Sequence, residues 1–116
     1  MDIIGKGFQS GDGKQGKLTD EDENKLLDGV MKWHIDRVGE HKLEKKIKTE
    51  TFRDAVTLLN EIADIAEKQN HHPDLHLYYN KLQVVLYTHK VGGLTEKDFV
   101  VAAKIDDLLE KKGLPF

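Results

Sequence analysis

The sequence predicts a single α+β domain, in which a four-stranded antiparallel sheet carries three helices packed on one face, in the order α-β-β-α-β-β-α. Three segments with the 3.6-residue apolar period of helices alternate with two pairs of short segments whose apolar residues recur every second position. Turn-forming residues separate the members of each pair, which favours hairpins. Strand pairs beside helices are typical of α+β domains, and 116 residues is the length of one domain.

Composition and charge exclude several classes of protein. The chain has 38% hydrophobic and 34% charged residues, a net charge of −3 and no cysteine. An acidic balance argues against direct nucleic-acid binding, and the lack of thiols excludes disulfides and cysteine-ligated zinc. Since there is neither an apolar signal segment nor an apolar run of about 18 residues, we expect no membrane association. The predicted location is the cytoplasm, with the nucleus as a further candidate.

The first residues differ in composition from the rest of the chain. Residues 1–17 contain five of the ten glycines, interleaved with lysine and aspartate, and show no apolar period. Such a segment buries too little surface to offset the entropy of ordering it. We therefore expect a flexible lead-in over residues 1–17 and a single folded domain over residues 18–116.

The first helix is expected over residues 20–31, because Thr19 is a good N-cap and acidic residues follow it in the first turn. Two extended segments, 33–38 and 43–48, come next and predict the first strand pair. In the second of them apolar and charged residues alternate. The lysines of this segment, Lys45 included, are assigned to a solvated strand face.

The strongest helical pattern in the chain runs over residues 52–69, where apolar residues follow the 3.6-residue spacing closely. Either Thr49 or Thr51 is placed to cap its start. Pro73 disfavours helical geometry at the residue before it, so the helix should end near residues 70–71.

A second strand pair and a last helix complete the predicted domain. Residues 75–80 and 82–88 read as extended, with a tight connection at Asn80-Lys81. Thr95 followed by Asp98 resembles a capping box and opens the last helix, for which Gly113 is a natural C-terminal residue.

Histidines gather in the second half of the chain. Four of the six fall within nineteen residues, at His71, His72, His76 and His89. An ordinary histidine titrates near neutral pH, so a group of them suggests proton transfer or metal ligation. If the second strand pair forms a hairpin, His89 returns towards His71 and His72. Glu67, four residues before His71 on a helix, is placed to orient that ring.

Two other interpretations stay open on the residues alone. A histidine pair on a protein surface often has no function. A metal site is the sharper rival, because His72 and His76 project to the same side of an extended strand. The chain has no His-Glu-x-x-His motif and no cysteine, which makes zinc a weak candidate.

The spacing of these residues resembles the family of pterin-4a-carbinolamine dehydratases. The family pattern is an acid, a His-His-Pro triplet, an aromatic residue, a further histidine and a further aspartate. The matching residues here are Glu67, His71, His72, Pro73, Tyr79, His89 and Asp98. The resemblance covers about residues 18–112, including Leu18-Thr19 and Trp33 in the first half.

This resemblance implies a reaction and a set of roles. The reaction is the dehydration of 4a-hydroxytetrahydrobiopterin to quinonoid dihydrobiopterin, which recycles the cofactor of aromatic amino acid hydroxylases. His71 and His89 are implied as acid and base, and His72 as a group that positions the pterin. The remaining implied site residues orient the imidazoles or line the pterin: Glu67, Asn70, Pro73, Tyr87, Thr88 and Asp98.

The resemblance further implies no metal, no bound cofactor apart from the pterin substrate, and a homodimer or homotetramer. It also raises a function of another class, as a dimerisation partner of a homeodomain transcription factor. Two positions depart from the family pattern: Leu75 stands where a tryptophan is usual, and Lys90 where an acid is usual. Neither departure removes a proton-transfer group, so we expect altered substrate preference rather than loss of activity.

Overall fold

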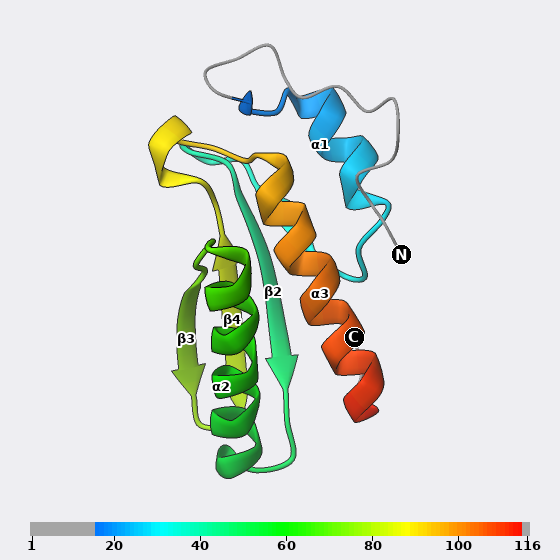
Figure 1. The fold of residues 1–116 in the computed structure, drawn as a ribbon, viewed down its shortest axis with the longest axis vertical. Coiled ribbons are helices and arrows are strands. Elements are labelled where there is room, and N and C mark those ends of the chain that lie inside the picture. The colour runs from blue at the N-terminus through cyan, green and yellow to red at the C-terminus, as the bar shows by residue number, and fades with distance from the viewer. Residues whose placement is uncertain (1–15, 115–116) are drawn as a thin grey trace.

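The computed structural model of the protein describes residues 16–114. The predicted order of helices and strands is confirmed (Figure 1). The elements are α1 (Asp20–Leu27), β1 (His34–Asp36), β2 (Lys42–Lys48), α2 (Phe52–Gln69), β3 (Asp74–Tyr78), β4 (Lys81–Leu86), a 3₁₀ turn η2 (His89–Val91) and α3 (Glu96–Lys112). Most of the predicted lead-in, residues 1–15, lies outside the described residues, so its flexibility stays a prediction.

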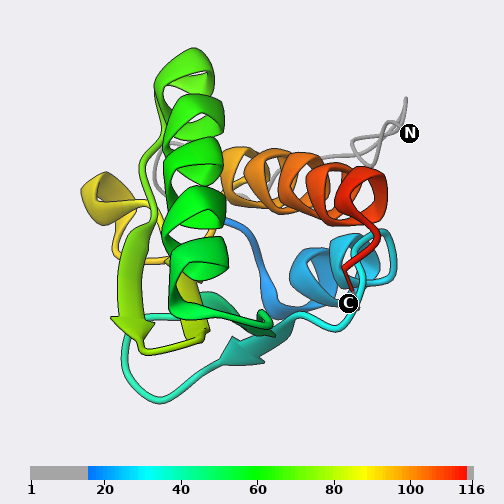
Figure 2. The same ribbon diagram turned by 90° about the horizontal axis from the view of Figure 1, so that it is seen from below.

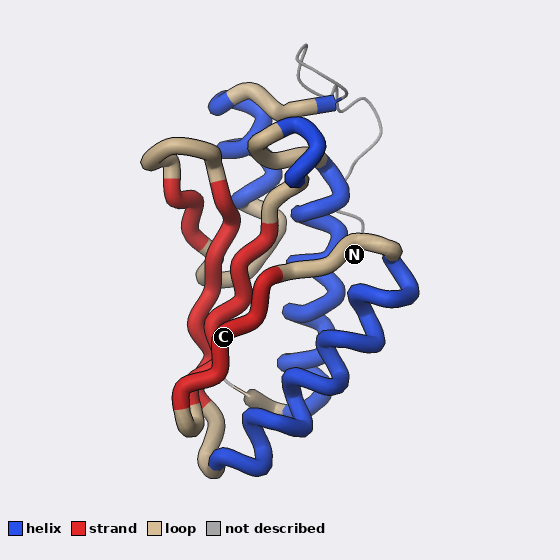
Figure 3. Tube along the Cα trace, turned by 90° about the vertical axis from the view of Figure 1, so that its left-hand side faces the viewer, coloured by secondary structure: helices blue, strands red, loops and turns tan. Residues whose placement is uncertain are grey.

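The four strands form one antiparallel sheet in the order β1-β2-β4-β3. Both predicted hairpins form, and β2 pairs with β4 in the centre through Leu43–Leu86 and Ile47–Leu82. Figure 3 shows the strands as one layer, with helices on one side of it. Figure 2 shows α1 beside α3 and away from α2. The core lies between these layers, as the α+β prediction requires.

Helix α1 is shorter than predicted, since it ends at Leu27 rather than at Met31. Gly29 is a poor helix residue, and the N–H groups of Gly29 and Val30 bond to carbonyls three residues back, which tightens the last turn. The N–H of Met31 donates to the Asp106 carboxylate at 2.8 Å instead of continuing the helix. A partner on α3, 75 residues away in sequence, therefore decides where the chain leaves α1.

Helix α2 has the bounds that the sequence predicts. Thr51 is its N-cap: the Thr51 hydroxyl accepts the N–H of Asp54 at 3.0 Å, whereas the Thr49 hydroxyl donates to the Thr51 carbonyl. The buried face of α2 packs on the sheet through Ala55, Leu58, Ile62 and Ala66. The predicted capping box and glycine end of α3 are also confirmed.

The assignment of Lys45 to a solvated face is wrong. Lys45 is only 2% exposed, whereas Lys46 and Lys48 are exposed as predicted. The strand period places Lys45 on the helix-facing side of β2. Its ammonium donates to the Met31 carbonyl at 2.7 Å and to the Asp106 carboxylate at 3.0 Å. Burial of this charge is tolerated because these acceptors replace water.

The second hairpin differs slightly from the prediction. The tight turn sits at Tyr79-Asn80 instead of Asn80-Lys81, and Tyr79 takes a positive φ of 54° there. β4 ends at Leu86, so His89 lies in η2 rather than at the end of a strand. Among residues 16–114, no helix has the length and hydropathy that crossing a bilayer would require.

Candidate active site

The predicted site residues come from three places that meet at one end of the sheet: the end of α2, the segment between β4 and η2, and the start of α3 (Figure 1). β3 begins with Asp74 opposite Val85 of β4. His71 and His72 therefore lie beside the segment that leads from β4 to His89. This confirms that the hairpin returns the chain towards the histidine pair.

Asn70 makes the turn that separates the two histidines from α2. It has φ 50° and ψ 43°, the left-handed region, which asparagine adopts more readily than other non-glycine residues. The N–H of His71 bonds back to the Ala66 carbonyl at 3.1 Å, which closes the end of the helix. The chain thus leaves the helical path one residue before His71.

The left-handed conformation of Asn70 leads to a prediction. Asn70→Val should lower the free energy of unfolding by about 1–2 kcal/mol, because a β-branched side chain is strained at positive φ. Asn70→Gly should leave stability nearly unchanged. Asn60→Val, the same replacement at an exposed helical position of α2, should also have little effect. Urea unfolding measures all three, and an equal loss for the two valine variants would contradict this account.

The ring of His71 is held by Asp98 of α3. Nε2 of His71 lies 2.5 Å from Oδ1 of Asp98, and the side chains are 11% and 0% exposed. An ionised carboxylate only accepts hydrogen bonds, so beside it Nε2 carries the proton. Nδ1 of His71 is then the nitrogen that can take or give a proton. The contact with Asp98 therefore fixes the tautomer of the His71 ring.

The other carboxylate oxygen of Asp98 accepts two hydrogen bonds. Oδ2 accepts the backbone N–H of Thr95 at 2.9 Å and the hydroxyl of Thr88 at 2.9 Å. Asp98 thus closes the capping box of α3 and holds His71 with the same carboxylate. Sequence reasoning recognised Thr95 only as a helix cap, although its spacing to Asp98 also placed it beside the site.

Glu67 pairs with His72 and not with His71, contrary to the prediction from helix spacing. Oε2 of Glu67 lies 2.6 Å from Nε2 of His72, and the two side chains are 76% and 56% exposed. The four-residue rule fails because Asn70 ends the helix before His71. An exposed ion pair of this kind contributes little to stability.

His89 is exposed at the start of η2 and lies against Tyr87. The two ring centroids are 4.0 Å apart at an interplanar angle of 38°. The ammonium of Lys42 lies 5.0 Å from the centroid of the Tyr87 ring. His89 directly follows Thr88, which donates to Asp98, so His71 and His89 border the same hydrogen-bonded group.

The metal alternative receives no support from the predicted pair. His76 stacks on Tyr78 with centroids 6.5 Å apart, on the outer side of β3. Within residues 16–114, the grouping with metal-ligand spacing lies elsewhere, at Asp20, Glu23 and His41. The Glu23 carboxylate there already accepts hydrogen bonds from Arg37 and pairs with His41, and so ties α1 to the β1–β2 connection.

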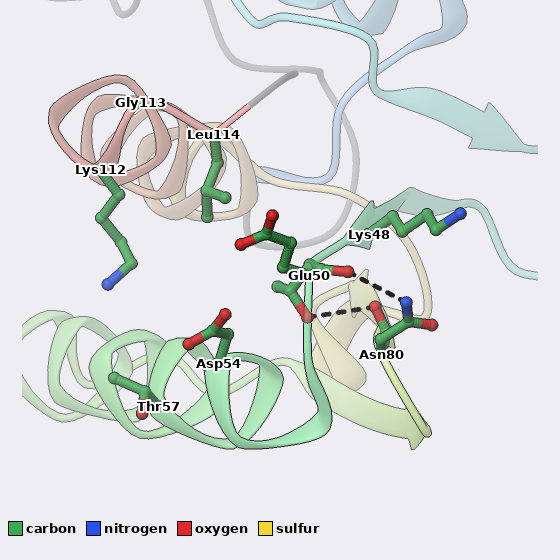
Figure 4. Close-up of a pocket in the computed structure, with 9 residues that line it drawn as sticks. Lys48, Glu50, Asp54, Thr57, Asn80, Lys112, Gly113 and Leu114 are labelled. Carbon is green, nitrogen blue, oxygen red and sulfur yellow. Dashed lines mark hydrogen bonds between the residues drawn. The ribbon is translucent and has the colours of Figure 1, made fainter.

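Of two cavities in the structure, one lies beside the candidate site and the other lies away from it. A cavity of about 410 Å³ is lined by Thr88, Thr95, Lys90 and their neighbours, next to Asp98. A second, of about 850 Å³, lies between the start of α2 and the end of α3. Figure 4 shows Glu50, Asp54 and Lys112 around it. Neither cavity is lined by a histidine, and in the second the lining residue of α2 nearest to Asn70 is Thr57, about 20 Å away along the helix.

Comparisons with known proteins agree with this fold. Residues 16–108 match the family described as pterin 4 alpha carbinolamine dehydratase. A putative pterin-4-alpha-carbinolamine dehydratase of Rubrobacter xylanophilus is 38% identical over 91 residues, which are 78% of this chain and 83% of that protein. The mitochondrial pterin-4-alpha-carbinolamine dehydratase 2 of Arabidopsis thaliana is 38% identical over 102 residues, covering 82% of this chain and 54% of that protein.

Comparison with a solved structure indicates the same family. The crystal structure of a transcriptional coactivator/pterin dehydratase from Brucella melitensis has a TM-score of 0.74 and 30% sequence identity to this chain. The match covers 79% of this chain and 97% of that one. The family that the histidine spacing suggested is therefore confirmed, and this chain belongs to the pterin-4-alpha-carbinolamine dehydratases.

Proposed function

We propose that this protein dehydrates 4a-hydroxytetrahydrobiopterin to quinonoid dihydrobiopterin by histidine general acid–base catalysis. Membership of the dehydratase family supports the reaction. The observation that carries the histidine mechanism is the 2.5 Å contact between the His71 ring, 11% exposed, and the fully buried Asp98 carboxylate, which also accepts a hydrogen bond from Thr88, the residue before His89. A histidine held by a buried carboxylate is well suited to give and take a proton.

The chemistry requires one proton donor and one proton acceptor. Hydroxide is a poor leaving group, so an imidazolium protonates the 4a-oxygen as the bond from C4a to oxygen breaks, and water leaves. A lone pair of a neighbouring ring nitrogen forms the new double bond to C4a. A second, neutral imidazole removes the proton from that nitrogen. In this proposal His71 and His89 supply the two imidazoles, and no metal or additional cofactor takes part.

The other predicted residues position the pterin or the rings. His72, exposed and paired with Glu67, is assigned to pterin binding. Pro73 restricts the backbone of His72 to extended geometry. The backbones of Asn70, Tyr87 and Thr88 line the pterin, whose donor and acceptor edges require fixed partners.

The test is a direct assay. Decay of the 4a-carbinolamine, generated by a phenylalanine hydroxylase, is followed by absorbance with and without this protein. The protein should accelerate the decay, and His71→Ala and His89→Ala should each reduce kcat by at least about a hundredfold. His76→Ala is the matched control, because His76 lies on the outer side of β3. Full activity in either His71→Ala or His89→Ala would refute the acid–base assignment.

The oligomeric state, the protein partner and the cellular location of this protein stay predictions. These are the homodimeric or homotetrameric state, the role as a dimerisation partner of a homeodomain transcription factor, and action in the cytoplasm or nucleus. His89→Ala separates the two functions, since it removes a proposed proton-transfer group from the exposed start of η2. It should reduce kcat for dehydration by at least about a hundredfold and leave partner binding intact.

A further inference from the structure

Two threonine hydroxyl groups, those of Thr88 and Thr95, are hydrogen-bonded in a row next to the contact between Asp98 and His71. The hydroxyl oxygens of Thr95 and Thr88 are 2.9 Å apart, and the Thr88 hydroxyl donates to Oδ2 of Asp98. A hydroxyl has a single proton. Because the proton of Thr88 points to Asp98, the proton of Thr95 must point to Thr88. The hydrogen bonds therefore run in one direction, from Thr95 through Thr88 to the carboxylate.

Three groups contact the Asp98 carboxylate directly. Thr88 and the backbone N–H of Thr95 donate to Oδ2, while His71 lies against Oδ1. This set of hydrogen bonds fixes the orientation of the carboxylate, and with it the ring of His71.

From this geometry we propose that Thr95 is a positioning residue for the dehydration, acting on His71 through Thr88 and Asp98. The proposal rests on the proposed function, which makes His71 an acid–base group. It adds a role to Thr95 beyond the start of α3. In the capping box, the half from the Thr95 backbone N–H to Asp98 does not need the Thr95 side chain, whereas the other half uses the Thr95 hydroxyl as acceptor for the Asp98 N–H, which Thr95→Val loses and Thr95→Ser keeps.

The neighbouring cavity explains why the Thr95 hydroxyl matters. Thr88 and Thr95 both line the space of about 410 Å³ beside the site, so the Thr88 hydroxyl borders a space that is open to solvent. Thr95 as a whole residue is 8% exposed. Its hydroxyl donates to the hydroxyl oxygen of Thr88. Without it, Thr88 can turn its proton towards solvent, and Asp98 then loses one of its two Oδ2 donors.

The experiment compares Thr95→Val, Thr95→Ser, Thr88→Val and the Thr88→Val/Thr95→Val double variant. Thr95→Val should lower kcat by about fivefold with KM unchanged, the size expected for one lost hydrogen bond. Thr95→Ser keeps the hydroxyl and should restore kcat to within about twofold. Because both threonines act through one chain, the double variant should be no slower than Thr88→Val alone.

Two further readouts separate positioning from folding. The proton that His71 shares with Asp98 should give a far-downfield ¹H NMR signal, and Thr95→Val should shift it while Thr95→Ser should not. Thermal unfolding of each variant reports any loss at the start of α3.

The proposal is overturned if Thr95→Ser is as slow as Thr95→Val, or if the effects of the two valine substitutions simply multiply. If the wild-type protein has no dehydratase activity, the proposed function fails. The NMR signal then still decides whether Thr95 orients His71, since an unshifted signal in Thr95→Val rejects that role.

Discussion

Asp98→Asn should reduce kcat for carbinolamine dehydration by about a thousandfold, within the range of a lost acid–base group, while the protein stays folded. The Thr88 hydroxyl and the Thr95 N–H both donate to Oδ2, so an amide must place its oxygen there. Its NH₂ group then faces Nε2 of His71. The ring proton is forced to Nδ1, the nitrogen that the proposed reaction needs free.

Glu67→Gln is the matched control for this prediction. It makes the same change from carboxylate to amide beside a histidine, but the Glu67–His72 pair is exposed to water. We expect kcat to change by less than about threefold, since exposed ion pairs contribute little, and any effect through His72, which is assigned to pterin binding, to appear in KM. The stopped-flow assay of carbinolamine decay measures both variants. Similar losses in both would show that burial of Asp98 is not what makes its contact with His71 important.

Lys45→Met should cost about 3 kcal/mol of unfolding free energy, because it removes one partner of a buried ion pair. Asp106 keeps its hydrogen bonds from Trp33 and from the Met31 N–H, each 2.8 Å long, but its charge loses the Lys45 ammonium. The Met31 carbonyl also loses its donor. Urea unfolding followed by circular dichroism measures the change.

The neighbouring residue supplies the control. Lys46→Met makes the identical replacement one position along β2, where the side chain is exposed, and should change stability by less than about 0.5 kcal/mol. If Lys46→Met were as destabilising as Lys45→Met, the loss would come from strand composition rather than from the buried pair.

The same comparison yields a pH dependence. Burial lowers the pKa of Lys45 below its usual value, although Asp106 opposes this shift. The folded protein therefore releases this proton at a lower pH than the unfolded chain does. Between those two pKa values the unfolded state binds more protons, so stability rises with pH. Wild-type protein should gain stability relative to Lys45→Met as the pH rises towards about 10.4, the usual lysine value; a gain on acidification would contradict this.

Local signals predicted the elements that are long and regular. Helix α2 has the bounds that apolar spacing, Thr51 and Pro73 indicated, because an 18-residue amphipathic pattern with clear end signals leaves little freedom. The short α1 was predicted too long. Its end depends on Asp106, which lies 75 residues away and has no local signature.

The composition of the candidate site was also readable from the chain. The resemblance to a known family brought His71, His72, His89 and Asp98 into one pattern, and membership of that family is confirmed. Which carboxylate holds which histidine was not readable. The left-handed turn at Asn70 takes His71 off the helical face, so Glu67 meets His72 and Asp98 meets His71.

By itself, the sequence determined the fold class, the helix and strand order and the family, and it predicted the residues to which the proposed chemistry is assigned. Only the tertiary structure decided that Lys45 is buried against Asp106 and that Thr95, Thr88 and Asp98 converge on His71. The physical reason is the sequence separation between the residues that interact. Periodicity and capping act within a few turns of chain, whereas these contacts join residues up to 61 positions apart. Such pairs form only when packing brings the elements together.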